Sequence, residues 1–257
     1  MLHKDSSAFR TRFEAVDALR GLAMVWMTAF HFCFDLNQFG YLRQDFYRDP
    51  VWTWQRTLIL SLFLFCAGMG QAIAVAQGQS GSRFWRRWAQ VLGCALLVTV
   101  GSWLMYPQSF IYFGVLHGIA LMLIIARFTT RWGGWLWGLG AGVIAIKYIA
   151  IYAIETGATP LFIDILNSPQ LNWLGLITRK PITEDYVPLL PWLGVMWWGV
   201  AAGAWLSRQG SGRLSWRLRA TLVKPLATLG RWSLSYYLLH QPVMIGALMA
   251  VRWLAGK

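Results

Sequence analysis

The strongest constraint on this chain is a series of long segments that contain no charged residue. These segments cover residues 57–82, 88–126, 186–207 and 232–251. A helix needs about 20 mostly apolar residues to cross the hydrocarbon core of a bilayer. The segment 88–126 is long enough for two crossings, and Pro107 near its middle ends a helix at little cost. The pattern predicts an all-α, polytopic transmembrane helix bundle.

Seven helices are expected, at residues 14–36, 57–77, 86–105, 111–127, 132–154, 188–207 and 232–254. The composition agrees with this class, because only 13% of the residues are charged, against about 25% in soluble proteins. The sequence contains no internal repeat and no separate soluble segment, so we interpret residues 1–257 as a single transmembrane domain. The apolar stretch 161–166 lies in the longest loop, and we expect it at the membrane surface or folded back over the helices.

The distribution of basic residues predicts the orientation of the helices. With the N-terminus in the cytoplasm, 15 of the 23 Lys and Arg residues fall on the cytoplasmic side. Cytoplasmic loops of membrane proteins carry such an excess, so we predict a cytoplasmic N-terminus and an external C-terminus. On a membrane protein the formal charge of +13 indicates contact with anionic lipid rather than with nucleic acid.

Histidine and aspartate side chains inside the predicted helices mark a candidate site. His31 and Asp35 are four residues apart, so they share one face of the first helix. A carboxylate that orients a histidine makes a general base that works near neutral pH. His117 is expected at a similar depth, because its helix runs in the opposite direction. The alternative is that these side chains only hold the helices together by packing and hydrogen bonds.

Three further features leave alternatives open. Asp17 and Arg20 lie at the cytoplasmic end of the first helix, where they form either a structural ion pair or part of a site for an anionic ligand. His240 stands near Pro242, whose missing N–H leaves a backbone carbonyl for polar neighbours. The basic segment 208–231 attracts phosphate groups, either of lipid or of a nucleotide-like cofactor. The three cysteines lie in apolar runs, so we expect no disulfide and no metal site.

Four stretches of the sequence resemble, in the same order, the DUF1624 family of bacterial membrane proteins. That family is grouped with the catalytic domain of heparan-alpha-glucosaminide N-acetyltransferase. The first stretch, 12–23, is followed by His31 and Asp35. The other stretches are 113–117, 185–194 and 234–242. The resemblance therefore extends over nearly the whole chain.

The resemblance implies an acyltransferase in the bacterial inner membrane. Such an enzyme moves an acetyl or other acyl group from cytosolic acyl-CoA, its co-substrate, to an acceptor on the outer face, commonly a sugar. A histidine acts as the base or briefly carries the acyl group. The candidate catalytic residues are His31, Asp35 and His117. The candidates for binding acyl-CoA are Arg12, Asp17 and Arg20, and those for binding the acceptor are Asp185, Trp192 and His240.

Two other functions stay open at this point. A small transporter or flippase would use Lys147 and His240 to line a path, although it would favour internal repeats that this sequence does not contain. A structural membrane protein would use the same polar residues for packing alone. The expected partners are membrane lipid, acyl-CoA and a glycan acceptor, and a homodimer is also considered.

Overall fold

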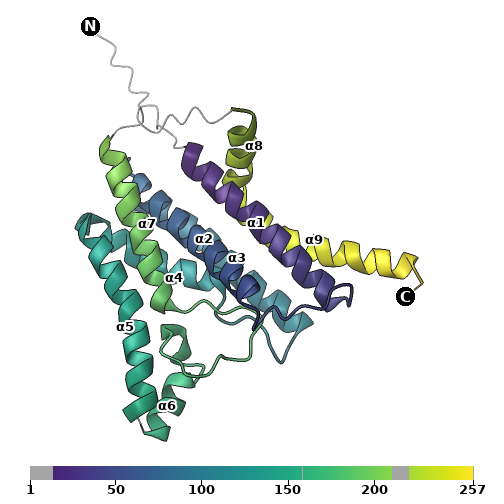
Figure 1. Cartoon of the computed structure of the whole chain (residues 1–257). Helices are drawn as coiled ribbons and strands as arrows, with labels where there is room; N and C mark the ends of the chain where they lie inside the picture. Colours follow the sequence, from purple (N-terminus) through teal and green to yellow (C-terminus); the bar gives the residue numbers. More distant parts are fainter. Residues whose placement is uncertain (1–13, 158, 210–219, 257) are drawn as a thin grey trace.

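The computed structural model describes residues 14–157, 159–209 and 220–256, which form nine α-helices and two short 3-10 helices (Figure 1). In chain order they are α1 (Glu14–Gln38), α2 (Pro50–Ala76), α3 (Gly81–Met105), α4 (Val115–Thr129), η1 (Thr130–Trp132), α5 (Trp135–Gly157), α6 (Pro160–Asn167), η2 (Asn172–Leu174), α7 (Leu189–Gln209), α8 (Ala220–Arg231) and α9 (Ser233–Leu254). All seven predicted helices are present, as α1, α2, α3, α4, α5, α7 and α9.

Six of these helices are long and apolar enough to cross a membrane, so the chain is a multi-pass membrane protein. They are α2, α3, α4 with η1, α5, α7 and α9. The first predicted span, α1, is as long as the others at 25 residues. It is less apolar, because it carries Glu14, Asp17, Arg20, His31 and Asp35.

The structure corrects the start of the second helix and adds two shorter helices. α2 begins at Pro50 rather than at residue 57, because the Asp49 side chain accepts a hydrogen bond from the Val51 N–H at 2.8 Å and Pro50 supplies a preset backbone angle. The apolar stretch 161–166 lies within α6. α8 occupies part of the basic segment 208–231, which the sequence pattern treats as a loop.

Close backbone contacts at glycines hold one half of the molecule together. α7 lies beside both α2 and α5 (Figure 1). A Cβ atom on Gly68 or Gly199 would clash with the backbone of the opposite helix in the α2–α7 pair. Small residues permit this approach, which is a usual basis of helix association in membranes. The largest buried core, which includes Leu64 and Met196, surrounds this contact.

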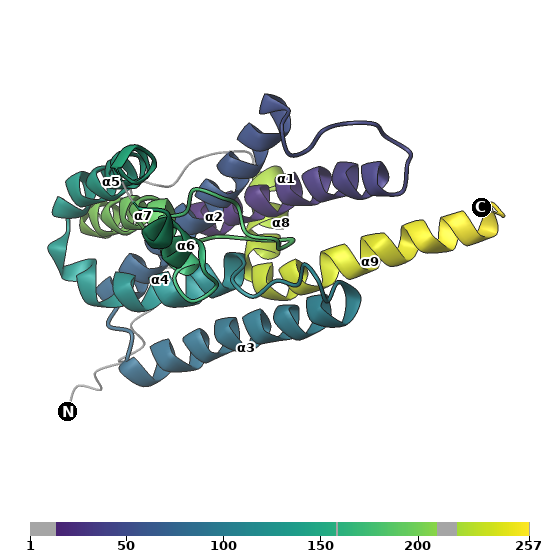
Figure 2. The same ribbon diagram turned by 90° about the horizontal axis from the view of Figure 1, so that it is seen from below.

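A second group of helices joins the two ends of the chain. α8 runs antiparallel to α1, and a Cβ atom on Gly21 would clash with the backbone of Leu226. α9 then runs parallel to α1, where the Tyr236 hydroxyl contacts Thr28 Oγ1 at 2.7 Å. Figure 2 shows α9 extending away from the other helices toward the C-terminus. The first and last long helices therefore lie side by side.

The two loops that flank α4 and α7 are also joined. Phe113 and Tyr186 form an isolated parallel β-bridge, in which the Val187 N–H donates to the Phe113 carbonyl at 3.1 Å. The Ser109 hydroxyl donates to Glu184 at 2.6 Å. These bonds fix the segment 182–188 against the N-terminal end of α4.

Candidate functional site

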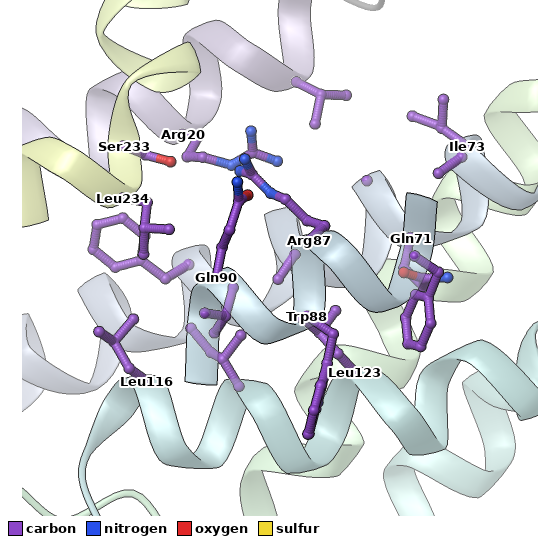
Figure 3. Close-up of a pocket in the computed structure, with 18 of the residues that line it drawn as sticks. Arg20, Gln71, Ile73, Arg87, Trp88, Gln90, Leu116, Leu123, Ser233 and Leu234 are labelled. Carbon is purple, nitrogen blue, oxygen red and sulfur yellow. The ribbon is translucent and has the colours of Figure 1, made fainter. Parts of the chain in front are cut away.

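A cavity of about 680 Å³ lies among α1, α2, α3, α4 and α9. One end of it is rimmed by four arginines, Arg20 from α1 and Arg83, Arg86 and Arg87 from the first turns of α3. Figure 3 shows the Arg20 and Arg87 side chains meeting inside the cavity, with Gln90 between the helices and Ser233 beside Arg20. The cavity therefore presents a concentrated positive charge at this end.

The positive charge at this rim is only partly neutralised. Asp17 is the one acidic residue among those that line the cavity, and its carboxylate lies 3.3 Å from Arg20. The other oxygen of Asp17 lies 3.7 Å from Arg231 of α8, so two arginines share one carboxylate. Within the described part of the chain, no carboxylate pairs with the three arginines of α3. A cluster of this kind binds an anion, and guanidinium groups fit phosphate oxygens especially well.

Away from the arginines, the cavity wall becomes apolar. Met24, Phe63, Val115 and Leu116 line it there, together with the ring of Tyr237 from α9. Tyr237 is also in contact with His240, because their ring centroids lie 5.8 Å apart. Tyr237 therefore stands between the cavity and a second group of polar side chains.

That second group joins His31 and Asp35 of α1 to His240 and Gln241 of α9. The rings of His31 and His240 are perpendicular, with centroids 5.2 Å apart. Gln241 Nε2 donates to Asp35 Oδ1 at 3.4 Å. Asp35 Oδ2, His31 Nδ1 and His240 Nε2 are all buried and have no hydrogen-bond partner. Buried polar atoms without partners are uncommon in folded proteins and often occur where a ligand binds.

His117 lies in a different hydrogen-bond network, at the N-terminal end of α4. Its Nδ1 accepts the Gly114 N–H at 3.3 Å, so the neutral ring carries its hydrogen on Nε2. That nitrogen lies 3.1 Å from Thr99 Oγ1 on α3, and the Thr99 hydroxyl donates to the Ile111 carbonyl at 2.8 Å. Both ring nitrogens of His117 are thus occupied by the protein itself.

Asp185 and Trp192 also make contacts that stabilise the fold. Asp185 Oδ2 accepts the Val115 N–H at 2.7 Å, which satisfies one free backbone group at the start of α4. Burial in the loop raises the pKa of the Asp185 carboxyl, and the bond from Val115 partly offsets this rise. Trp192 packs against the core around α7 and does not line the cavity.

The structure thus groups the sequence candidates differently from the sequence pattern. It brings Asp17 and Arg20 into the cavity and His31, Asp35 and His240 into one cluster. Arg12 and the segment 210–219 lie outside the described residues. Within the described ranges, no three His, Cys, Asp or Glu side chains are placed to hold a metal ion.

Sequence reasoning missed the arginines of α3 and the position of Tyr237 as cavity residues. A signal existed for the arginines, because Arg83, Arg86 and Arg87 recur at helical spacing on one predicted helix. No comparable signal marked Tyr237, since an aromatic residue in an apolar helix is ordinary packing material.

The profile of one protein family matches residues 12–242, and the family is described as heparan-alpha-glucosaminide N-acetyltransferase, catalytic. The matched range begins in the segment before α1 and ends within α9, so it includes both the cavity and the histidine cluster. No curated protein and no solved structure matches the chain.

Proposed function

The chain belongs to the family of the heparan-alpha-glucosaminide N-acetyltransferase catalytic domain, and from this premise we propose that it is a membrane-embedded acyltransferase. In this proposal acyl-CoA is the donor, and a sugar or another molecule with a nucleophilic amine or hydroxyl group is the acceptor. The observation that carries the proposal is the cavity itself, which has arginines at one end and the histidine cluster beyond the other.

The arginine rim suits the phosphate groups of acyl-CoA. The donor carries a diphosphate and a further phosphate on its ribose, joined to the thioester by a flexible, mostly uncharged arm. In our proposal Arg20, Arg83, Arg86 and Arg87 bind the phosphates, and Asp17 holds Arg20 in place. The arm then runs along the apolar wall toward Tyr237. This path directs the thioester toward the histidine cluster.

The histidine cluster suits the acceptor. His31, Asp35 and His240 present three unpartnered polar atoms within one buried region, which an amine or hydroxyl group of the acceptor would occupy. The new bond from the acceptor nitrogen or oxygen to the acyl carbon forms as the carbon–sulfur bond breaks. The proton that the acceptor loses passes to a histidine and then to the departing thiolate of CoA.

The distribution of basic residues supports an arrangement across the bacterial inner membrane. The arginine rim lies near the N-terminal ends of α1 and α3, which are cytoplasmic in the predicted orientation. His31 and Asp35 lie farther along α1, toward its predicted outer end. The donor would therefore enter from the cytoplasm, and the acceptor would be modified at the outer face.

The direct test follows an acyl group from donor to acceptor. The purified protein, in lipid nanodiscs, is incubated with radiolabelled acetyl-CoA and a panel of amino sugars and sugars, and the label is separated into protein, lipid and glycan fractions. Binding of labelled acetyl-CoA is measured separately by equilibrium dialysis. We expect saturable binding and transfer of label to at least one acceptor. A protein that binds no acetyl-CoA, or that transfers label to nothing, would contradict the proposal.

A pair of matched variants tests the donor site. Arg87→Gln removes a rim charge, and Arg43→Gln makes the same change at an exposed position outside the cavity. A hydrogen bond to a charged group contributes about 1.5–3 kcal/mol, so we expect Arg87→Gln to weaken acetyl-CoA binding at least about tenfold. Arg43→Gln should bind as tightly as the parental protein. Nanodiscs without anionic lipid exclude competition from lipid phosphates. Equal affinity of both variants would contradict the assignment of Arg87.

A further inference from the structure

The hydrogen bonds of His240 fix which of its nitrogens carries a hydrogen atom. His240 Nδ1 lies 2.8 Å from the backbone carbonyl oxygen of Tyr237. A carbonyl oxygen only accepts hydrogen bonds, so Nδ1 is the donor and bears the hydrogen. In the neutral ring, Nε2 is then the nitrogen with a free lone pair. The backbone of α9 itself sets this tautomer.

The free nitrogen of His240 is enclosed by the protein but has no partner in it. His240 is only 8% exposed, and its Nε2 is buried without a hydrogen bond. A buried acceptor that forms no hydrogen bond costs about 1–3 kcal/mol. Such an atom in a functional region is available to a ligand that brings a donor group, such as an amine or a hydroxyl.

The surroundings of His240 hold its ring in one orientation. The Tyr236 ring stacks on it nearly parallel, at 8° and 5.8 Å, and the Tyr236 hydroxyl is anchored to Thr28 on α1. His31 meets it edge to face at 5.2 Å. The titratable groups near it are therefore His31 and Asp35 on α1, with Tyr236 and Tyr237 on its own helix. No comparable contact to a carbonyl sets the tautomer of His31, whose Nδ1 is unpartnered.

Tyr237 connects this ring to the cavity. Its side chain lines the cavity wall, while its backbone carbonyl holds His240 Nδ1. A thioester that reaches the Tyr237 ring therefore lies next to the imidazole. Donor, acceptor and base can meet at this one position, which proximity-based catalysis requires.

We propose that His240, rather than His31, is the general base of the transfer reaction. This inference rests on the proposed acyltransferase function. His240 Nε2 takes the proton from the amine or hydroxyl of the acceptor as that atom bonds to the acyl carbon. The carbon–sulfur bond breaks, and the thiolate of CoA receives the proton from Nε2, so the products are the acylated acceptor and free CoA. His31 and Asp35 bind and position the acceptor beside that nitrogen.

Two substitutions at His240 separate the base from its support. Asn in place of His240 has an amide N–H close to the position of Nδ1, so His240→Asn can still donate to the Tyr237 carbonyl but has no basic nitrogen. His240→Gln places an amide near the position of Nε2 instead. Loss of a general base costs about 10²- to 10⁴-fold in rate. We expect this loss in both variants with unchanged affinity for acetyl-CoA.

The pH profile distinguishes a base from a structural residue. In the parental protein the transfer rate should rise with pH through one ionisation, as the base loses its proton. His240→Asn should lack this rise and have only a low, flat rate. His31→Gln should be slower but should keep the rise, because the base is still present. A merely structural role of His240 would lower the rate and leave the shape of the profile unchanged.

Each outcome bears on one of the two proposals. If the parental protein transfers no label, the acyltransferase proposal fails. If it transfers label and His240→Asn does so at the parental rate, or if His31→Gln alone loses the pH-dependent rise, the assignment of His240 is wrong. Should neither His240 variant fold, as judged by thermal melting and acetyl-CoA binding, the profiles of the parental protein and His31→Gln still decide. A rise present in the parental profile and kept in His31→Gln supports His240, and its absence from either contradicts the assignment.

Discussion

The imidazole rings of His31 and His240 meet edge to face, with centroids 5.2 Å apart and an interplanar angle of 89°. They come from the first and last long helices of the chain, which run in the same direction. Parallel neighbours of this kind bring together residues at equal depth. The contact therefore depends on how the helices assemble and not on either helix alone.

The first prediction concerns topology. The excess of basic residues predicts a cytoplasmic N-terminus and an external C-terminus. Alkaline phosphatase fused after Lys257 should be active, because this reporter works only outside the cytoplasm. Fusion of a fluorescent protein that matures only in the cytoplasm should give no signal at the same position. The reverse pattern of the two reporters would contradict the orientation.

The second prediction concerns the contact between α1 and α8. Gly21→Ala should lower the free energy of unfolding by about 1–3 kcal/mol, because the added Cβ would clash with the backbone of Leu226. Thermal melting in detergent measures the effect. Gly93→Ala is the matched control, since a Cβ on Gly93 meets no atom within 4 Å. Equal melting temperatures for the two variants would mean that the α1–α8 contact is looser than described.

The third prediction concerns the start of α4. Asp185→Ala should destabilise the protein by about 1 kcal/mol, the usual cost of losing a side chain that caps a helix. Asp185→Asn keeps an oxygen that accepts the Val115 N–H, so it should be closer to the parental protein. Chemical or thermal unfolding measures both. If Asp185 only binds the acceptor, both variants would melt like the parental protein.

The fourth prediction is the pH dependence at the same residue. Because burial raises the pKa of the Asp185 carboxyl above its ordinary value of 3.8, the folded protein binds the proton more tightly than the unfolded chain does. The stability that results is fully present below pH 3.8 and is lost as the pH rises through the raised pKa. Asp185→Asn does not titrate. Its stability relative to the parental protein should therefore increase with pH over this range, and a constant difference would argue against the raised pKa.

The fifth prediction tests whether His117 is a structural residue. His117→Ala leaves the Gly114 N–H without its acceptor and removes the partner of Thr99. A double-mutant cycle with Thr99→Val, measured by thermal melting, should give a coupling energy of about 0.5–3 kcal/mol. A folded His117→Ala variant should keep the pH-dependent rise of the transfer rate. A variant with parental stability but without that rise would make His117 a catalytic residue.

The sequence predicts the long helices well because membrane spans follow from local composition. Each apolar run between charged residues corresponds to a helix, with most boundaries a few residues from those predicted. The start of α2 was missed because Asp49 and Pro50 extend the helix into a polar stretch by local capping. α8 was missed because its basic residues hide a helix that is stabilised by packing on α1.

The candidate site is harder to predict because it depends on which helices are neighbours. His31 and Asp35 are recognisable as a pair from their spacing, and the structure adds Gln241 and His240 from a distant part of the chain. His117 shares the expected depth, but its ring nitrogens are engaged by Gly114 and Thr99. Depth alone does not specify which side of a helix faces which neighbour.

The pairing of α1 with α9 also sets an order for biosynthesis. α1 leaves the ribosome first, but the ring that faces His31 and the Tyr237 side of the cavity belong to the last long helix. Until α9 is inserted, the polar face of α1 has no lasting partner in the nascent protein. The insertion machinery or the lipid headgroups must shelter Asp35 and His31 during that interval. The site is thus completed only when translation of the last long helix is complete, and a nascent chain arrested before α9 cannot catalyse transfer.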